Sequence, residues 1–104
     1  MRRGEIWWAN LPPPIGRRPV LLLSRNRVYQ VRASATVATL TTTIRGLRSE
    51  VRLGPADGVP RDCVVNLDTI HTIAIGAIQT QIASIETDRM DAVNRAIRFA
   101  LDLD

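Results

Sequence analysis

Most of the chain consists of short segments rich in strand-forming residues, separated by turn signals. Segments 18–24 (RPVLLLS) and 34–40 (SATVATL) are apolar without alternation, which predicts strands buried on both faces. Segment 49–53 (SEVRL) alternates polar and apolar residues, as expected of a half-exposed strand. The candidate strands are 4–11, 18–24, 34–40, 49–53, 63–73 and 77–85.

The end of the chain has a different period. Between Thr87 and Leu101, apolar residues recur at spacings of three and four, which predicts a helix. Thr87 is predicted to be its N-cap, and the carboxylate of Asp88 suits the positive end of the helix dipole. About five strands and one final helix predict a mainly β fold, with a small, curved antiparallel sheet or barrel closed by the C-terminal helix.

Two proline-rich segments predict loops between these strands. Residues 12–16 (PPPIG) include three successive prolines, which cannot donate backbone hydrogen bonds to a neighbouring strand. Residues 54–62 (GPADGVPRD) combine glycines and prolines, which also favours a loop.

The composition narrows the class of protein. The chain has 104 residues, of which 45% are hydrophobic, so residues 1–104 are expected to form a single domain with one core. Fourteen basic residues, all of them arginine, against ten acidic ones give a net charge of +4, which favours an anionic partner. A biased genomic base composition would equally produce a chain without lysine. The clustering of the arginines is therefore stronger evidence for an anionic partner than their number. The sequence has no long apolar run and no secretory leader, so we expect a cytoplasmic protein that does not span a membrane.

Metal and disulfide chemistry are not indicated by the sequence. The single cysteine, Cys63, has no partner within the chain for a disulfide. One cysteine and one histidine cannot build a Cys/His zinc site. We therefore expect chemistry without a metal ion or other cofactor.

The segment 16–25 (GRRPVLLLSR) places two arginines and a proline directly before a buried strand. A side chain at the first residues of such a strand is held by a rigid scaffold, while its charged head remains open to solvent and ligand. Pro19 also restricts Arg18 to an extended backbone, which limits where that arginine points. This segment is the strongest local indication of a functional site.

Several motifs follow one another in a characteristic order. They are RGEIWWANL, RRPVLLLS, TVATLTTT, RDCVVNLDTIHT and TDRMDAVNRAIRFALDL. Together they resemble the MazF/PemK family of toxin endoribonucleases from toxin–antitoxin pairs, nearly from end to end of the chain. The resemblance implies an SH3-like barrel, a homodimer, and metal-independent cleavage of single-stranded RNA at a short sequence. It also implies neutralisation by a small acidic antitoxin of the MazE/PemI type, whose extended tail lies over the RNA site.

The resemblance also implies roles for individual residues. Arg18, before the proline of the second strand, and Thr41, at the end of TVATLT, match the family's catalytic pair. A guanidinium and a hydroxyl suit the stabilisation of a charged transition state formed when the RNA 2′-hydroxyl attacks the phosphate. The pKa of arginine is above about 12, so Arg18 is a poor general base and that role stays unassigned. The candidate RNA-binding residues are Arg17, Thr42, Arg45, Asp68, Thr69 and His71.

Three features depart from the family pattern. The loop between the first two strands is reduced to residues 12–16, whereas family members commonly have a longer loop with glycine and glutamate. His71 stands where arginine is usual, and Cys63 replaces the serine of a DSV sequence. The short loop bears on both cleavage specificity and activity, because the longer loop normally helps to cover the RNA.

Some candidate residues also have a plain structural explanation. His71 either contacts RNA or is a packed residue of a strand, and the second interpretation is preferred. Cys63 is expected to be a small buried residue rather than a reactive thiol. Arg17 either binds RNA or is only solvated. Without the resemblance, Thr41 would be interpreted as part of a threonine-rich strand end.

The adjacent residues Trp7 and Trp8 must point to opposite faces of a strand, so one is expected in the core and the other outside it. For Trp8 a dimer contact, stacking on a base and plain surface exposure all remain open, with the dimer contact preferred. The difficulty of placing both tryptophans in one small core is a secondary argument for a homodimer.

Two other functional classes remain open at this point. CcdB-like toxins bind a topoisomerase without catalysis, but they carry a functional tryptophan at the extreme C-terminus, whereas this chain ends in FALDLD. A catalytically inactive RNA-binding or antitoxin-binding module is the other class. Arg18 and Thr41 argue against it, and the short loop argues for it.

Overall fold

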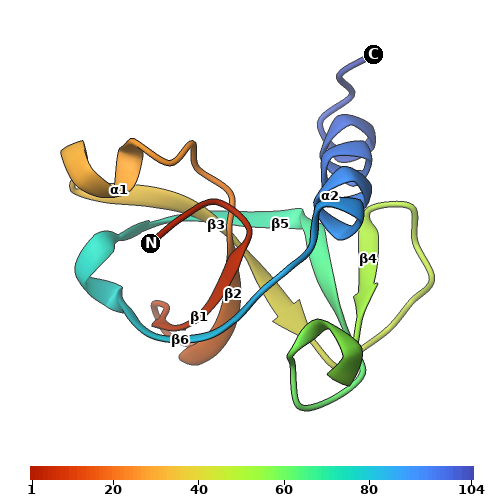
Figure 1. The fold of residues 1–104 in the computed structure, drawn as a ribbon, viewed down its shortest axis with the longest axis horizontal. Helices are drawn as coiled ribbons and strands as arrows, with labels where there is room; N and C mark the ends of the chain where they lie inside the picture. Colours follow the sequence, from red (N-terminus) through yellow and green to blue (C-terminus); the bar gives the residue numbers. More distant parts are fainter.

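The computed structural model covers residues 1–104 and contains six strands and two α-helices (Figure 1). All the candidate strands are confirmed, with ends that differ from the predicted ones by two residues or fewer. The strands are β1 (Glu5–Asn10), β2 (Arg17–Leu22), β3 (Ser34–Thr41), β4 (Glu50–Leu53), β5 (Cys63–Ala74) and β6 (Ile78–Ser84). The helices are α1 (Val28–Val31) and α2 (Thr87–Ala100), with 3₁₀ turns η1 (Pro55–Asp57) and η2 (Ile75–Ala77).

All six strands belong to one antiparallel sheet, in the order β4-β5-β3-β2-β1-β6. Figure 1 shows this sheet strongly bent, with the long strand β5 running across the molecule. The mainly β fold with a C-terminal helix is therefore confirmed. No ladder joins β4 to β6, so the sheet has two open edges and its hydrogen bonding does not close into a barrel.

The central strand β2 separates two hydrophobic cores. Leu21 packs into the larger core, whereas its neighbours Val20 and Leu22 pack into a smaller core on the opposite face. All three side chains are completely buried. Successive side chains of a strand point to opposite faces, so burial on both faces requires the unalternating apolar run seen in this segment. The prediction of a strand buried on both faces is confirmed for β2.

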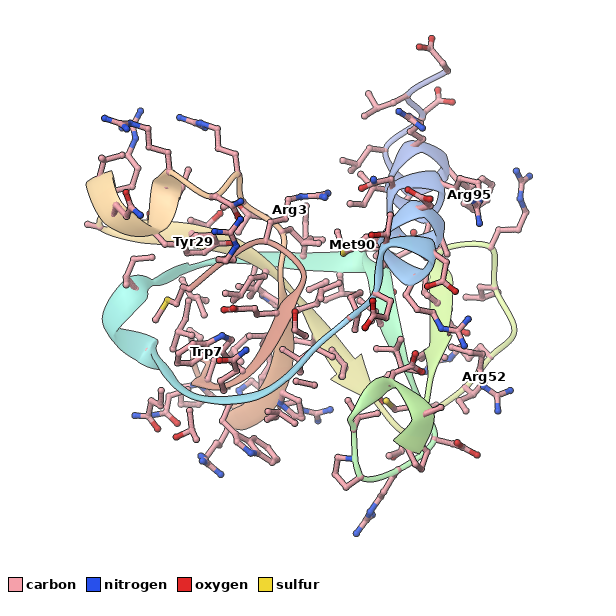
Figure 2. All side chains as sticks on the ribbon, in the orientation of Figure 1. Arg3, Trp7, Tyr29, Arg52, Met90 and Arg95 are labelled. Atoms are coloured by element: carbon pink, nitrogen blue, oxygen red, sulfur yellow. The ribbon has the colours of Figure 1, made fainter.

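The adjacent tryptophans of β1 lie in different surroundings. Trp7 packs against the smaller core, and its indole N–H donates a 3.0 Å hydrogen bond to Oε1 of Glu5 (Figure 2). Trp8 lines a cavity on the other face of the strand. The prediction that the two rings point to opposite faces is confirmed. Because the second core accommodates Trp7, the crowding of the two rings no longer argues for a dimer.

Helix α2 packs against β4 and β5 and covers the larger core with its buried residues Val93 and Ala96. The N-cap is Glu86, whose backbone is extended and whose side chain caps no backbone group. The prediction of Thr87 as N-cap is therefore wrong by one residue, because Thr87 already has helical backbone. No helix of the protein combines the length and the apolar character needed to cross a membrane.

The short helix α1 was not predicted from the sequence. It is a single turn held by backbone hydrogen bonds such as that from Arg32 N to Val28 O, at 2.9 Å. Four residues are too few for a periodic apolar pattern, so the sequence carries no helical signal there.

Strands β2 and β3 pair over only a short stretch, which ends at the pair Val20–Thr39. The preceding residue of β2 is Pro19, which has no N–H to continue the ladder. On its other edge β3 pairs with β5 from Ser34 to Thr41, with a register shift between Ala38 and Leu40, so the end of β3 keeps a partner where β2 no longer pairs with it. The beginning of β2 and the end of β3 therefore diverge, and the side chains between them are free to line a cavity.

Candidate active site

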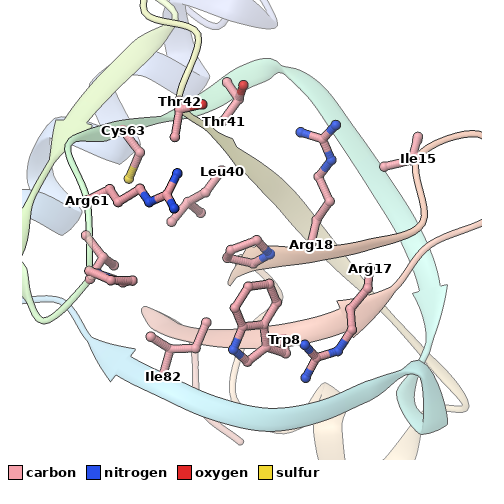
Figure 3. Close-up of a pocket in the computed structure, with 13 residues that line it drawn as sticks. Trp8, Ile15, Arg17, Arg18, Leu40, Thr41, Thr42, Arg61, Cys63 and Ile82 are labelled. Atoms are coloured by element: carbon pink, nitrogen blue, oxygen red, sulfur yellow. The ribbon is translucent and has the colours of Figure 1, made fainter.

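A cavity of about 580 Å³ lies where β2 and β3 diverge (Figure 3). Its apolar part includes Leu40 and Cys63, which also belong to the larger core. Its polar part consists of arginines and threonines, without any aspartate or glutamate, which makes it suited to an anion. The lining residues are Trp8, Ile15, Arg17, Arg18, Pro19, Leu40, Thr41, Thr42, Val59, Pro60, Arg61, Cys63 and Ile82.

Arg18 combines a fixed backbone with an exposed side chain. It pairs with Ala9 of β1, which is completely buried in the smaller core, and it precedes Pro19. In Figure 3 its guanidinium points toward the end of β3 that carries Thr41. The structure thus gives Arg18 the anchored backbone and open head predicted from the sequence.

Arg17 lies against the indole of Trp8. The guanidinium carbon of Arg17 is 4.5 Å from the centroid of the ring, within the range of a cation–π interaction. Both residues line the cavity. Arg17 is therefore held in the site by an aromatic contact, although its side chain is exposed to solvent.

Thr41 and Thr42 line the cavity from the end of β3. Thr41 pairs with Val64 of β5, and its Oγ1 accepts a 3.2 Å hydrogen bond from the backbone N–H of Thr43. This bond orients the hydroxyl and leaves its own proton available to a ligand. The structure therefore brings together four of the predicted site residues, Arg17, Arg18, Thr41 and Thr42.

Arg61 is a further arginine of the cavity and was not predicted from the sequence. It lines the cavity from the loop before β5, next to Pro60. In Figure 3 it lies on the far side of the cavity from Arg18, beside Leu40 and Cys63. The available signal was an arginine close to the start of a buried strand, the same feature that marked Arg18.

Cys63 is a buried thiol at the base of the cavity. Burial raises the pKa of the Cys63 thiol, and the negative charges of Asp62 and Asp57 raise it further. The thiol is therefore protonated at neutral pH and is a weak nucleophile. This agrees with the interpretation of Cys63 as a small packed residue.

Three other predicted RNA-binding residues lie outside this cavity in the single chain. Arg45 is exposed in the loop after β3, and its backbone N–H donates a 3.0 Å hydrogen bond to Glu50 Oε1. On β5, Oδ2 of Asp68 accepts a hydrogen bond from the Ser49 hydroxyl. Thr69 Oγ1 accepts a 3.3 Å hydrogen bond from the Asn66 side chain.

His71 is the remaining candidate outside the cavity. It pairs with Val37 of β3 and is two residues from Ile73, both of which belong to the smaller core. Residues at this spacing share a face of the strand, which places His71 beside that core. Its Nε2 is buried and has no hydrogen-bond partner in the chain. This position agrees with a packed histidine rather than with one directed into the cavity.

The cavity offers hydrogen-bond donors and positive charge but no evident proton acceptor. No group of three or more His, Cys, Asp or Glu side chains is placed to hold a metal ion. The guanidinium of Arg18 and the hydroxyl of Thr41 supply donors from two directions, which suits a phosphate whose negative charge grows during a reaction. The apolar part beside them suits a planar or apolar group attached to that phosphate.

Comparison with known sequences identifies the family. Residues 2–101 match the family described as PemK-like, MazF-like toxin of type II toxin–antitoxin system. The chain belongs to this family. It is 42% identical over 101 residues to the probable endoribonuclease MazF5 of Mycobacterium tuberculosis, covering 96% of this chain and 92% of the relative. It is 41% identical over 99 residues to the probable endoribonuclease MazF2 of the same species, covering 94% and 95%.

Solved structures of a MazF toxin and of a mycobacterial endoribonuclease have the same fold. The toxin MazF-mt6 of Mycobacterium tuberculosis superimposes with a TM-score of 0.89 at 36% identity, covering 96% of this chain and 98% of that one. A mycobacterial endoribonuclease in complex with its cognate antitoxin superimposes with a TM-score of 0.90 at 28% identity, covering 100% and 97%. The resemblance to the MazF/PemK family inferred from the sequence is confirmed.

The loop at residues 12–16 of this MazF/PemK-family chain reaches the cavity. Hydrogen bonds from Leu11 N to Gly16 O, at 3.0 Å, and from Ile15 N to Pro12 O, at 3.1 Å, hold it as a compact turn. The side chain of Ile15 lines the cavity. The loop therefore contributes one apolar residue to the site.

Proposed function

We propose that this chain is the toxin of a type II toxin–antitoxin system and a metal-independent endoribonuclease that cleaves single-stranded RNA. Membership of the MazF/PemK family supports the class of activity. The observation that carries the assignment of the site is that Arg18 and Thr41 line one cavity, which contains no acidic side chain.

Arg18 and Thr41 act on the scissile phosphate. The 2′-oxygen of the RNA attacks the phosphorus and the 5′-oxygen leaves, which yields a 2′,3′-cyclic phosphate and a 5′-hydroxyl. The guanidinium of Arg18 stabilises the negative charge of the pentacovalent transition state, and the hydroxyl of Thr41 donates to a phosphate oxygen. Arg17 and Thr42 hold the RNA beside them. The general base is not assigned to any residue.

Four further residues bind RNA outside the cavity, where their polar groups contact unstacked bases. They are Arg45 in the loop after β3, and Asp68, Thr69 and His71 on β5. The physical support differs among them. Arg45 is exposed and cationic, whereas the polar groups of Asp68 and Thr69 already have hydrogen-bond partners in the chain. His71 lies beside the smaller core, so its part in RNA binding has the least support.

The partners follow from the family. A mycobacterial neighbour has been solved in complex with its cognate antitoxin, and an acidic antitoxin suits the +4 charge of this chain. We expect the toxin to act in the cytoplasm as a homodimer of single-domain chains. The strongly bent sheet would correspond to the family's SH3-like barrel, with the two edges β4 and β6 left unpaired. A monomeric mass by light scattering at micromolar concentration would contradict the homodimer.

The activity is tested by incubating the purified protein with a long RNA in excess EDTA. We expect discrete cuts, which an added antitoxin suppresses. A cleavage that disappears in EDTA and returns with magnesium would contradict the metal-independent reaction. Intact RNA under all these conditions would reject the nuclease in favour of a non-catalytic class, either a CcdB-like toxin or a binding module.

A further inference from the structure

A second hollow, of about 380 Å³, lies between β4 and α2 and shares no lining residue with the cavity of Arg18 and Thr41. Four arginines line it, and we call it the arginine groove. They are Arg48, Arg52, Arg89 and Arg95. Figure 2 shows Arg52 on β4 and Arg95 on α2 along the same side of the molecule. The groove is therefore a separate, strongly basic surface.

Most of the positive charge of the groove has no partner within the chain. Arg48, Arg52 and Arg95 are exposed and form no ion pair. Arg89 is the exception, because its Nε lies 3.1 Å from Oδ1 of Asp57. Its two terminal nitrogens have no hydrogen-bond partner in the chain and remain available to a ligand.

The single acidic side chain of the groove is directed toward its own chain. Oε1 of Glu50 accepts hydrogen bonds from the backbone N–H groups of Arg45 and Leu47, at 3.0 and 3.3 Å. Its Oε2 is buried, so this carboxylate offers little negative charge to the solvent. A groove with this excess of positive charge fits a polyanion.

The shape of the groove favours a nucleic acid over an acidic polypeptide. Its floor includes the small residues Ala92 and Ala96, which form no deep apolar pocket for the side chains of a protein partner. The guanidinium carbon of Arg48 lies 4.3 Å from the centroid of the half-exposed Phe99 ring. Exposed guanidinium groups bind phosphates with two parallel hydrogen bonds, and an exposed aromatic ring can stack on any base.

The sheet connects the groove to the cavity. Val64 of β5 pairs with Thr41 on one side and with Arg52 on the other. Side chains of directly paired residues point to the same face of a sheet, so Thr41 and Arg52 lie on one face, two strand spacings or roughly 10 Å apart. A strand of RNA whose phosphate lies at Thr41 therefore reaches Arg52 within a few nucleotides.

We propose that the arginine groove between β4 and α2 binds the phosphates of the RNA segment that flanks the cleaved bond. This proposal rests on the proposed function and adds to it a second contact surface outside the cavity. Phosphate contacts position a strand and raise its affinity without selecting its bases. The groove thus strengthens the binding of long RNA, whereas the cavity holds the nucleotides at the cut.

Binding of single-stranded DNA tests the groove without cleavage, because DNA lacks the 2′-hydroxyl. The probes are a strand of about 4 nucleotides, which the cavity alone can hold, and one of about 20 nucleotides. The groove variant is Arg52→Ala/Arg95→Ala. Its matched control is Arg25→Ala/Arg27→Ala, which removes the same charge from exposed arginines between β2 and β3, outside both the cavity and the groove.

We expect the groove variant to bind the long strand roughly 10-fold more weakly, and the short strand as the wild type does. The slope of log affinity against log salt for the long strand should decrease by about 1.4, which corresponds to two lost phosphate contacts. The control variant should keep the affinity and the slope of the wild type. Arg52→Gln/Arg95→Gln keeps most of the length of both side chains and should show the same loss, with an unchanged thermal melt.

Four outcomes would overturn the groove. They are absence of long-strand binding, unchanged long-strand affinity in a folded groove variant, an equal loss for both strand lengths, and an equal loss in the control variant. If the groove variants instead weaken only the binding of poly-glutamate, the groove belongs to an acidic polypeptide.

Cleavage of a long RNA by the wild type, measured separately, decides the proposed function. Cleavage together with unchanged long-strand affinity in the groove variants rejects only the groove. Groove-dependent binding without any cleavage rejects only the nuclease.

Discussion

Arg18 and Thr41 line one cavity, although the strands that carry them no longer pair at that point. The backbone of Arg18 is held by β1 and that of Thr41 by β5, so each side chain has its own rigid support. Divergence of two well-anchored strands leaves room for a ligand without a flexible loop. The geometry of this cavity is therefore a direct result of the end of the β2–β3 ladder at Pro19.

Replacement of Arg18 by alanine should lower the cleavage rate about 10²- to 10³-fold, because one donor to the charged transition state is lost. Its side chain is exposed and has no hydrogen bond or ion pair within the chain, so the thermal melt should not change. Cleavage rates and melting curves of Arg18→Ala and Arg27→Ala provide the comparison. Equal rates in the wild type and a folded Arg18→Ala protein would reject the catalytic assignment.

Replacement of Thr41 by alanine should cause a similar but milder loss of rate. The hydroxyl also accepts the hydrogen bond from Thr43 N, so its removal loosens the turn after β3 as well as the phosphate contact. Thr41→Ser keeps the hydroxyl and should restore most of the activity. If serine and alanine are equally defective, the methyl group rather than the hydroxyl is what the site needs.

The sequence alone predicted the strands well because their burial dictates their composition. The run from Val20 to Leu22 is apolar without alternation, since it separates two cores, and that pattern is visible without a structure. The four-residue helix α1 and the position of the N-cap of α2 at Glu86 escaped prediction because short turns and caps depend on local backbone geometry.

The candidate site was only partly predictable. Arg18 was found because it precedes a proline and a buried strand, and the family resemblance added Thr41. Arg61 was missed because a loop position carries no periodic signal, and its place in the cavity depends on how the chain folds back before β5. The shared cavity arises where the β2–β3 ladder ends, and no local pattern in the sequence specifies which distant residues line it.

The stability of the protein should fall in alkaline solution partly through Cys63. Burial and nearby carboxylates raise the pKa of this thiol above its ordinary value of 9.0. When the pKa of a group is higher in the folded protein than in the unfolded chain, the group stabilises the fold at pH values below its pKa in the unfolded chain. This stabilisation is lost as the pH rises through its pKa in the folded protein. Burial likewise raises the pKa of Tyr29 above 10.0.

Denaturant titrations of the wild type and Cys63→Ala, from about pH 8 to about pH 10.5, measure this effect. The free energy of unfolding should decrease more steeply with pH in the wild type than in the variant. Parallel curves for the two proteins would show that the thiol has the same pKa in the folded and unfolded states.

The short loop at residues 12–16 should relax the sequence specificity of cleavage. It contributes Ile15 to the cavity, and its three prolines restrict its closure over RNA. Phosphate contacts fix register without reading sequence, so we expect recognition of only about three nucleotides. Sequencing of the 5′ ends across a long transcript maps the cut sites. A strict motif of about five or more positions would place recognition elsewhere, in the loop around residues 41–48 that contains Arg45.

The central claim is that the protein cleaves RNA in the cavity lined by Arg18 and Thr41, where the 2′-hydroxyl of the RNA attacks the adjacent phosphate. The most direct measurement uses an RNA with a single 2′-deoxyribose at the nucleotide before a mapped cut, in the presence of EDTA. We predict that cleavage stops at that position, continues at other cut sites, and leaves 2′,3′-cyclic phosphate ends detectable by mass spectrometry. Persistent cleavage at the 2′-deoxy position, or product ends carrying a 5′-phosphate, would contradict this mechanism.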